Sequence, residues 1–345
     1  GGQLGDAGYL TNDNGSLQVL DTKKHEGLHI HRVRAVSGTI ASGEEVKAEV
    51  DAARRKDTIL HHSSAHVFHS AVRQIFGIEV TQAGSQVGPN AMRFDFSLSK
   101  QPSKQELAQV ENLMNEWVRT ASPVNTQVMS IDEAKQTGAI AMFGEKYGDT
   151  VRVVKMGDFS LEFCGGTHVN NTAEIGQIKI ISEGSISQGV RRVEALSGQK
   201  AWQYITDQLT HLGDATDKLK VKPAEMVAQI ERLQDNLKAK EKQLQLMEEK
   251  VALARIPDLL AKATQTGEMT VVAQVVPDIS AASLKSIAEQ LKNRSGDLAV
   301  MLIATQPDSS VSIVTAFSAA MVKRGFNAGK VAGEVAQIVG GKGGG

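Results

Sequence analysis

Two short motifs, separated by about one hundred residues, constrain what this chain can fold into. The first, His62-Ser63-Ser64-Ala65-His66, carries two histidines four residues apart, and the second, Cys164-Gly165-Gly166-Thr167-His168, carries the only cysteine four residues before a histidine. Residues at that spacing share one face of a helix, so the first two imidazoles can reach one ion. The two glycines permit a tight loop that turns the second pair inward. If all four groups bind one ion, distant segments must fold together.

These four side chains, His62, His66, Cys164 and His168, form a plausible tetrahedral zinc site, because thiolate and imidazole are ligands that zinc takes in proteins. A histidine pair alone is a weak signal, and the sole thiol beside another histidine strengthens it. No glutamate follows His62, which excludes an HExxH protease site. Four protein ligands close the coordination sphere, so the pattern leaves both a structural and a catalytic zinc open.

Length and composition predict a multidomain soluble protein, since 345 residues with 41% hydrophobic content allow two or three cores. A single cysteine excludes an intrachain disulfide. No apolar run approaches the ~20 residues of a membrane span and no signal segment opens the chain, so we expect a cytoplasmic protein without a membrane partner. Lysine plus arginine (38) nearly equals aspartate plus glutamate (39), so any RNA contact must use local patches. The first glycine and the closing Gly-Gly-Lys-Gly-Gly-Gly predict that both ends are cuts within a longer protein.

The hydrophobic pattern predicts an α+β multidomain fold whose first two parts are residues 1–57 and 58–200. The first part has short alternating runs between Asn-Gly and Ser-Gly turn signals, which indicates a small β-barrel or sheet. The second part mixes helical and alternating periods, as expected of an α+β domain. Its predicted elements are a helix from Asp57 to Gly77, strands at 92–96, 151–155 and 177–182, and a helix at 104–120.

The remaining two parts are predicted as a helical hairpin at 201–256 and an α/β domain at 257–345. Two helical stretches flank a break at Val221-Lys222-Pro223, and the second carries apolar residues at alternating three- and four-residue steps, typical of a coiled-coil packing seam. The predicted elements of the last domain are strands at 271–276, 298–304 and 311–316 and helices from Ser280 and Ala319.

Five segments resemble, in order and spacing, the editing domain of the alanyl-tRNA synthetase family. They are His61–His69, Arg93–Ser97, Gly144–Asp149, Met156–Ser160 and Cys164–His168. In addition, Gly1-Gly2-Gln3 with Gly5-Asp6 resembles the glycine-rich motif that opens the family's barrel, Gly189–Ala195 resembles its closing strand, and Gly340–Gly345 resembles the glycine-rich stretch of its carboxy-terminal, DHH-associated domain. The resemblance covers nearly the whole chain, which lacks the aminoacylation half of the family.

The resemblance implies proofreading: hydrolysis of the ester that joins serine or glycine to alanine-specific tRNA, within a protein that ligates alanine to this tRNA using ATP. Such a second step is needed because a small apolar pocket discriminates between close analogues by only ~1–3 kcal/mol. The implied partners are mischarged tRNA(Ala) and, through the carboxy-terminal domain, a second copy of the protein. Candidate basic contacts to the tRNA are Lys323, Arg324 and Lys330.

The resemblance also assigns roles to single residues. It makes zinc ligands of the four histidine and cysteine side chains named above, places Gln82 in the substrate pocket, and places Arg191 near the tRNA terminus. Each has an alternative, because Gln82 could pair with backbone and Arg191 could form a surface ion pair. His69, one turn beyond His66, is a candidate general base and could equally pack beneath the site.

Two positions depart from the family pattern. Ala65 stands where threonine is common, so a hydroxyl that could bond a serine substrate is missing. His61 stands where asparagine is usual and could compete for the metal, although it would point about a quarter-turn away from His62. Two other functions stay open, namely a free-standing trans-editing hydrolase and a non-enzymatic RNA-binding module with a structural zinc.

Overall fold

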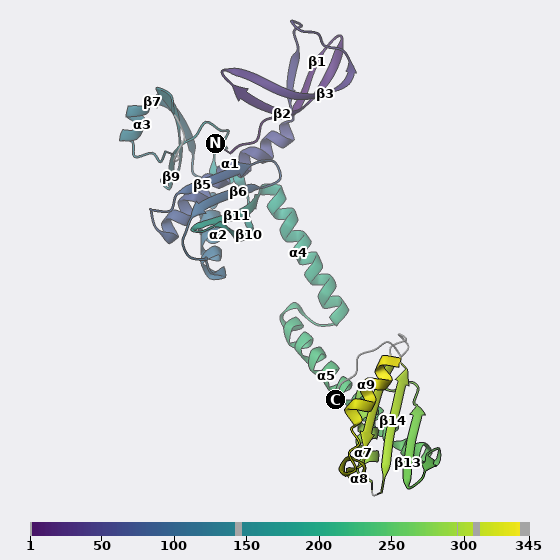
Figure 1. Cartoon of the computed structure of the whole chain (residues 1–345). Helices are drawn as coiled ribbons and strands as arrows, with labels where there is room; N and C mark the ends of the chain where they lie inside the picture. The colour runs from purple at the N-terminus through teal and green to yellow at the C-terminus, as the bar shows by residue number, and fades with distance from the viewer. Residues whose placement is uncertain (1, 142–146, 295, 306–310, 339–345) are drawn as a thin grey trace. The chain divides into compact units, whose positions relative to one another are not determined.

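The computed structural model describes residues 2–141, 147–294, 296–305 and 311–338, which form two compact units, Gly1–Ala215 and Thr216–Gly345 (Figure 1). Its mixed α+β character confirms the predicted fold class. Parts of the segments that carry the family resemblance lie outside the described residues, namely Gly1, Gly144-Glu145-Lys146 and Gly340–Gly345.

The first unit begins with an antiparallel sheet in the strand order β3-β2-β1-β4. Its strands are β1 (Gly8–Asn12), β2 (Gly15–His25), β3 (Leu28–Gly38) and β4 (Lys47–Val50). The β2–β3 connection is the pair Glu26-Gly27 with φ of 49° and 83°, the left-handed backbone that a two-residue hairpin turn requires. A β structure is therefore confirmed here, whereas its closure into a barrel stays a prediction.

Helix α1 (Ala52–Phe76) starts five residues before the predicted Asp57. The Asp51 carboxylate accepts a hydrogen bond from the Arg54 amide at 2.9 Å and caps the helix, and the polar first turn carries no apolar periodicity that would reveal this start. The predicted domain boundary at residue 57 thus falls inside one continuous helix. The centre of α1 is buried from Leu60 to Val72, which gives its histidines a fixed position.

Helix α1 lies along an antiparallel sheet with the order β10-β11-β6-β5 (Figure 1). The strands are β5 (Gln82–Val87), β6 (Met92–Ser97), β10 (Ile178–Ser187) and β11 (Val190–Ser197), and α2 (Lys104–Arg119) packs beside them. Phe68 is fully buried, with Phe94 and Phe96 edge-on at ring distances of 5.3 and 5.5 Å. Asn115 of α2 bonds both backbone groups of Ile178 at 2.9 Å, which joins this helix to β10.

A smaller sheet, β7-β8-β9, completes the part of this unit that surrounds the histidines. Its strands are β7 (Val124–Ser130), β8 (Thr150–Met156) and β9 (Ser160–Phe163), accompanied by α3 (Ile131–Gln136) and the short helix η1 (Thr172–Ile175). Along β9 the buried side chains are Ser160, Glu162 and Phe163. The loop after β9 carries the second of the two motifs, so this strand determines where Cys164 enters the site.

Two long helices follow, α4 (Gly198–Leu219) and α5 (Met226–Ala254), with the short η2 (Pro223–Glu225) at the predicted break. Both predicted helices are present. Their antiparallel pairing stays a prediction, because α4 belongs mainly to the first unit and α5 to the second. Among the described residues, no helix combines the length and apolarity that a bilayer span requires.

The second unit is a four-stranded sheet in the order β12-β13-β14-β15 with helices against it (Figure 1). Its elements after α5 are α6 (Ile256–Ala261), β12 (Thr264–Thr266), β13 (Met269–Val275), α7 (Ala281–Lys292), β14 (Leu298–Thr305), β15 (Val311–Phe317), α8 (Ala319–Lys323) and α9 (Ala328–Ile338). Strands β13 and β14 are parallel and joined through α7, whereas the outer pairs are antiparallel. The predicted strands and helices are confirmed, and their core is a separate apolar cluster that includes Leu284, Ile287 and Leu302.

We predict that Phe68→Ala destabilises the first unit by about 3–5 kcal/mol, because it empties a fully buried ring site between α1 and the central sheet. Ile78→Ala, at a side chain that is 78% exposed, should stay within about 0.5 kcal/mol of wild type. Both tryptophans, Trp117 and Trp202, lie in the first unit, so urea unfolding followed by their fluorescence measures the difference. Equal losses in the two variants would contradict this packing.

Candidate metal centre

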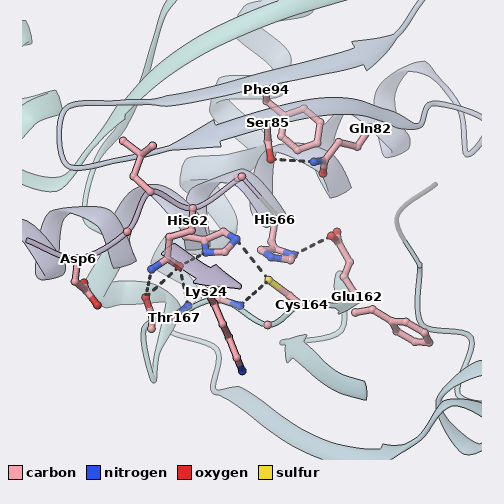
Figure 2. A pocket seen from close by; sticks show the side chains of 18 of the residues that line it. Asp6, Lys24, His62, His66, Gln82, Ser85, Phe94, Glu162, Cys164 and Thr167 are labelled. Carbon is pink, nitrogen blue, oxygen red and sulfur yellow. Dashed lines mark hydrogen bonds and ion pairs between the residues drawn. The ribbon is translucent and has the colours of Figure 1, made fainter. Parts of the chain in front are cut away.

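Helix α1 and the loop after β9 bring the four predicted ligand groups together. One nitrogen from each of His62, His66 and His168 and the Cys164 sulfur all lie within 4.8 Å of one another. Figure 2 shows three of these side chains, His62, His66 and Cys164, close together. The Cys164 Sγ is 3.5 Å from His62 Nε2 and 3.3 Å from His168 Nε2. The two motifs, far apart in the sequence, thus form one cluster, and its metal-binding role stays a prediction.

The amide of Gln3 determines which nitrogen of His62 faces the cluster. Its Oε1 accepts the Thr167 backbone N–H at 2.9 Å, and a backbone N–H only donates, so this atom is the oxygen of the amide. The same oxygen lies 2.7 Å from His62 Nδ1, which must therefore be the protonated, donating nitrogen. The lone pair of His62 is then on Nε2, toward Cys164.

Ser63 has the same effect on His168. Its hydroxyl donates to the Ile59 carbonyl at 2.9 Å and accepts the Val169 amide at 3.1 Å. The remaining contact, His168 Nδ1 at 3.3 Å, must then come from a protonated nitrogen. The lone pair of His168 is consequently on Nε2, the atom that faces the sulfur.

Glu162 completes the set beside His66. Its Oε2 lies 2.8 Å from His66 Nδ1 (Figure 2), and its Oε1 lies 3.0 Å from His69 Nδ1. All three side chains are buried. A carboxylate accepts but does not donate when ionised, so it favours a proton on His66 Nδ1 and leaves Nε2 for the cluster. Carboxylate and carbonyl partners of this kind accompany most metal-binding histidines.

The cluster dimensions fit a tetrahedral zinc ion. Bond lengths of about 2.3 Å to sulfur and 2.0–2.1 Å to nitrogen place the two ligand atoms about 3.6 Å apart at a tetrahedral angle. The two sulfur–nitrogen distances given above, 3.5 and 3.3 Å, are close to that value. Three Nε2 lone pairs and one sulfur form a donor set that zinc takes in proteins. The residues present therefore fit this ion.

At Cys164 and His168 the surroundings also favour the protonation state that binds a metal. Burial disfavours the Cys164 thiolate, but the close contacts with the imidazoles of His168, His62 and His66 outweigh it and lower the pKa of the thiol to about 2. Burial, reinforced by the neighbouring imidazoles, lowers the pKa of His168 to about 3. Burial also opposes the charge on His66, yet the facing Glu162 carboxylate raises the pKa of that imidazole to about 10. The His66 imidazole would thus have to lose a proton before its Nε2 binds a cation.

Arg152 and Gly166 shape the loop that presents Cys164. The Arg152 guanidinium donates to the carbonyl of Gly166 and, at 3.3 Å, to that of Cys164. A side chain at Gly166 would press on the His62 ring, and its Cβ would lie 2.7 Å from Gln3 Oε1. The neighbouring Gly165 has nothing within 4 Å of such a Cβ. The loop backbone thus comes close to the His62 ring only at Gly166, so glycine is required there and not at Gly165.

Three members of the cluster, His62, His66 and Cys164, line a pocket of about 500 Å³ in the first unit. Gln82, predicted as a pocket residue, lines it and donates through Nε2 to the Ser85 hydroxyl at 2.9 Å, so its partner is a side chain (Figure 2). Ala65 lines the pocket at the position where the family commonly has threonine. The walls include Phe94 and Phe163, which gives the site apolar sides around a polar centre.

Three other residues singled out in the sequence, Arg191, His69 and His61, lie in different surroundings. Arg191 is absent from the described lining of the pocket and forms a largely buried ion pair with Glu183, whereas the alternative that the sequence left open was a surface ion pair. His69 packs beneath the site against Glu162 and is also absent from that lining. The roles of both residues stay predictions. His61 is buried, with Nδ1 donating to the Gly88 carbonyl and Nε2 accepting the Ser197 amide, so it does not compete for the metal.

Sequence reasoning missed the three groups that orient the imidazoles: Gln3, Ser63 and Glu162. Glu162 gave no clear signal either, because in Ser160-Leu161-Glu162-Phe163 it stands at a polar position of the alternation, where a solvent-facing side chain is expected. Gln3 lies 59 residues from His62, and its contact depends on how the chain terminus folds back. Ser63 has the appearance of an ordinary helix residue until its three contacts are known.

Family models match three stretches of the chain. They describe tRNA synthetases class II (A) at residues 1–54, the threonyl and alanyl tRNA synthetase second additional domain at 151–194, and the DHHA1 domain at 268–345. The second of these stretches contains Glu162 and Cys164. Together the matches show similarity to class II aminoacyl-tRNA synthetases.

Individual relatives narrow that class. Alanine–tRNA ligases of Microcystis aeruginosa and Synechocystis sp. are 41% and 40% identical over 346 residues, and one of Haemophilus influenzae is 41% identical over 345 residues. Each match covers 100% of this chain and 39–40% of the relative. The chain therefore belongs to the alanyl-tRNA synthetase family and corresponds to the carboxy-terminal part of its members. It spans about 40% of the length of these curated relatives.

We predict that Gly166→Ala weakens zinc binding by roughly 10–100-fold, the range seen when the outer partners of metal-binding histidines are disturbed. The added methyl group would displace both His62 and the Gln3 amide. Gly165→Ala is the matched control, since its Cβ meets no atom within 4 Å. Competition against a chromogenic zinc chelator gives both affinities, and equal affinities would refute the proposed approach of loop to helix.

We also predict that Glu162→Gln lowers zinc affinity by about 10–100-fold while the chain stays folded. The substitution removes the charge that favours a proton on His66 Nδ1, and so weakens the preference for a free Nε2. Glu116→Gln, on the exposed face of α2, changes the net charge equally and should leave affinity unchanged. If both variants bind zinc like wild type, Glu162 does not orient the ligand.

Proposed function

We propose that this chain hydrolyses the ester that joins serine or glycine to alanine-specific tRNA, using zinc held by His62, His66, Cys164 and His168. One observation carries the proposal: His62, His66 and Cys164 line an open pocket together with exposed side chains such as Lys24, and His168 lies beside them in the cluster, so the four groups are not enclosed in a core as around a purely structural ion. Membership in a family whose named members are alanine–tRNA ligases supports the choice of substrate.

A hydrolytic site of this kind would correct errors made by the whole protein. An alanine pocket excludes glycine or serine by only ~1–3 kcal/mol, because glycine merely lacks a methyl group and serine merely adds a hydroxyl. Errors at that level require a second, hydrolytic step at a separate site. We therefore propose that the full-length protein ligates alanine to tRNA with ATP and that this part removes the errors.

The side chains of the pocket have distinct proposed tasks. When bound, zinc supplies Lewis-acid chemistry, either polarising the ester carbonyl or lowering the pKa of a water molecule. Gln82 orients the aminoacyl group, while Phe94 and Phe163 limit access of bulk water. Glu162 positions His66 and touches no substrate. Ala65 offers no hydroxyl for a serine side chain, so recognition of serine depends on the remaining polar groups.

The second unit is proposed to hold the tRNA through its DHHA1 domain and to pair with a second copy. Of the three candidate contacts, Arg324 forms an ion pair with Asp297, whereas Lys323 and Lys330 have no ion pair recorded within the described part of the chain. Lys323 shares a cavity with Lys292 and Arg294, which makes this surface locally basic. Binding that relies on such contacts weakens as salt rises, roughly in proportion to the phosphates neutralised.

Deacylation of seryl-tRNA(Ala) by the 345-residue chain tests the proposed function. We predict that Cys164→Ala and His168→Ala each lower the rate by more than the roughly 100-fold typical of outer-partner changes, because they remove ligands directly. His25→Ala removes a histidine whose side chain is 73% exposed and should retain full activity.

Circular dichroism provides the folding control for these variants. Wild-type chain that binds zinc but leaves seryl- and glycyl-tRNA(Ala) intact would favour the alternative of a non-enzymatic RNA-binding module with a structural ion. Ligand variants that stay folded and fully active would remove the metal from the mechanism.

A further inference from the structure

Lys24 stands at the edge of the pocket, near the end of β2. It is exposed, and it is the one lysine or arginine among the described residues that line the cavity. The same cavity contains His62, His66 and Cys164 (Figure 2). The amino-terminal sheet therefore contributes a cation to a site whose other parts come from α1, the central sheet and the loop after β9.

The alternation of side chains along β2 places Lys24 on the face of the strand that lines the pocket. Side chains two residues apart in a strand share a face, and Thr22 also lines the cavity while its hydroxyl donates to the Asp6 carbonyl. Lys24 pairs across the hairpin with His29, another lining residue. Lys23 pairs with Ile30 and is absent from the described lining, as expected of the opposite face.

The other charges around the cavity are already compensated. The Asp6 carboxylate forms an ion pair with Arg55, and Glu162 faces two buried histidines. For Lys24, no carboxylate partner is recorded within the described ranges of the chain. An uncompensated ammonium group at the mouth of the pocket thus leaves one positive charge available to a ligand.

We propose that Lys24, assisted by His29, binds the phosphate of the terminal nucleotide whose ribose carries the ester. This inference rests on the proposed function. With the ester at the histidine and cysteine cluster, a cavity of about 500 Å³ holds little more than the aminoacylated nucleoside, so its phosphate lies toward the edge. Lysine binds phosphate as a point charge, and such contacts fix the position of a nucleic acid without reading its sequence.

A pair of small esters isolates this contact: 3′-O-seryl adenosine 5′-monophosphate and 3′-O-seryl adenosine, which differ only in the phosphate. Wild-type chain should cleave the phosphorylated ester with kcat/KM about 5-fold higher, the upper range for an exposed ion pair, and the gain should lie in KM. Lys24→Gln should lose this preference, so that its kcat/KM values for the two esters become equal.

Lys23→Gln is the matched control, because it removes the same charge from the neighbouring residue on the opposite face. It should keep the full preference. With seryl-tRNA(Ala), Lys24→Gln alone should make the logarithm of kcat/KM fall less steeply with the logarithm of salt concentration, by about 0.7 for one single-strand phosphate.

Two results overturn the inference while leaving the proposed function intact: an undiminished phosphate preference in Lys24→Gln, or an equal loss in Lys23→Gln. Failure of the proposed function looks different, because wild-type chain would then cleave neither ester nor seryl-tRNA(Ala). That outcome would overturn both proposals together.

Discussion

The organisation of the first unit depends on three imidazole lone pairs facing one sulfur atom. A histidine presents its lone pair to a metal only when the other ring nitrogen carries the proton, and here Gln3, Glu162 and Ser63 provide a partner for that proton. The cluster therefore does not depend on an ion to choose its tautomers. Because each Nδ1 faces one of these oxygen atoms, the three Nε2 atoms are left to face Cys164.

These partners also explain why the pieces of the first unit must fold together. Gln3 brings the amino-terminal segment to the loop around Thr167, Ser63 joins α1 to the same loop, and Glu162 extends the connection to β9. The elements that hold the ligands also form the pocket, to which the amino-terminal sheet adds Lys24. Metal binding and pocket shape are consequently coupled, since displacement of one loop changes both.

Much of this arrangement could be predicted from the sequence, and the remainder depends on distant contacts. The spacing of the two motifs predicted the ligand cluster, and periodicity predicted α2, β14 and β15 closely. The start of α1 was missed because its first turn is polar and its cap is a single aspartate. The ion pair of Arg191 with Glu183 and the packing of His69 against Glu162 leave no local pattern in the sequence, and the roles of both residues stay predictions.

Zinc X-ray absorption spectroscopy on the zinc-loaded chain identifies the atoms around the ion, and so tests whether three histidines and Cys164 bind it. We expect a four-coordinate ion with one sulfur at about 2.3 Å and three imidazole nitrogens at about 2.0–2.1 Å. The sulfur signal should disappear in Cys164→Ala. A first shell of nitrogen and oxygen only in wild-type chain would contradict it, because the thiolate would then lie outside the metal site.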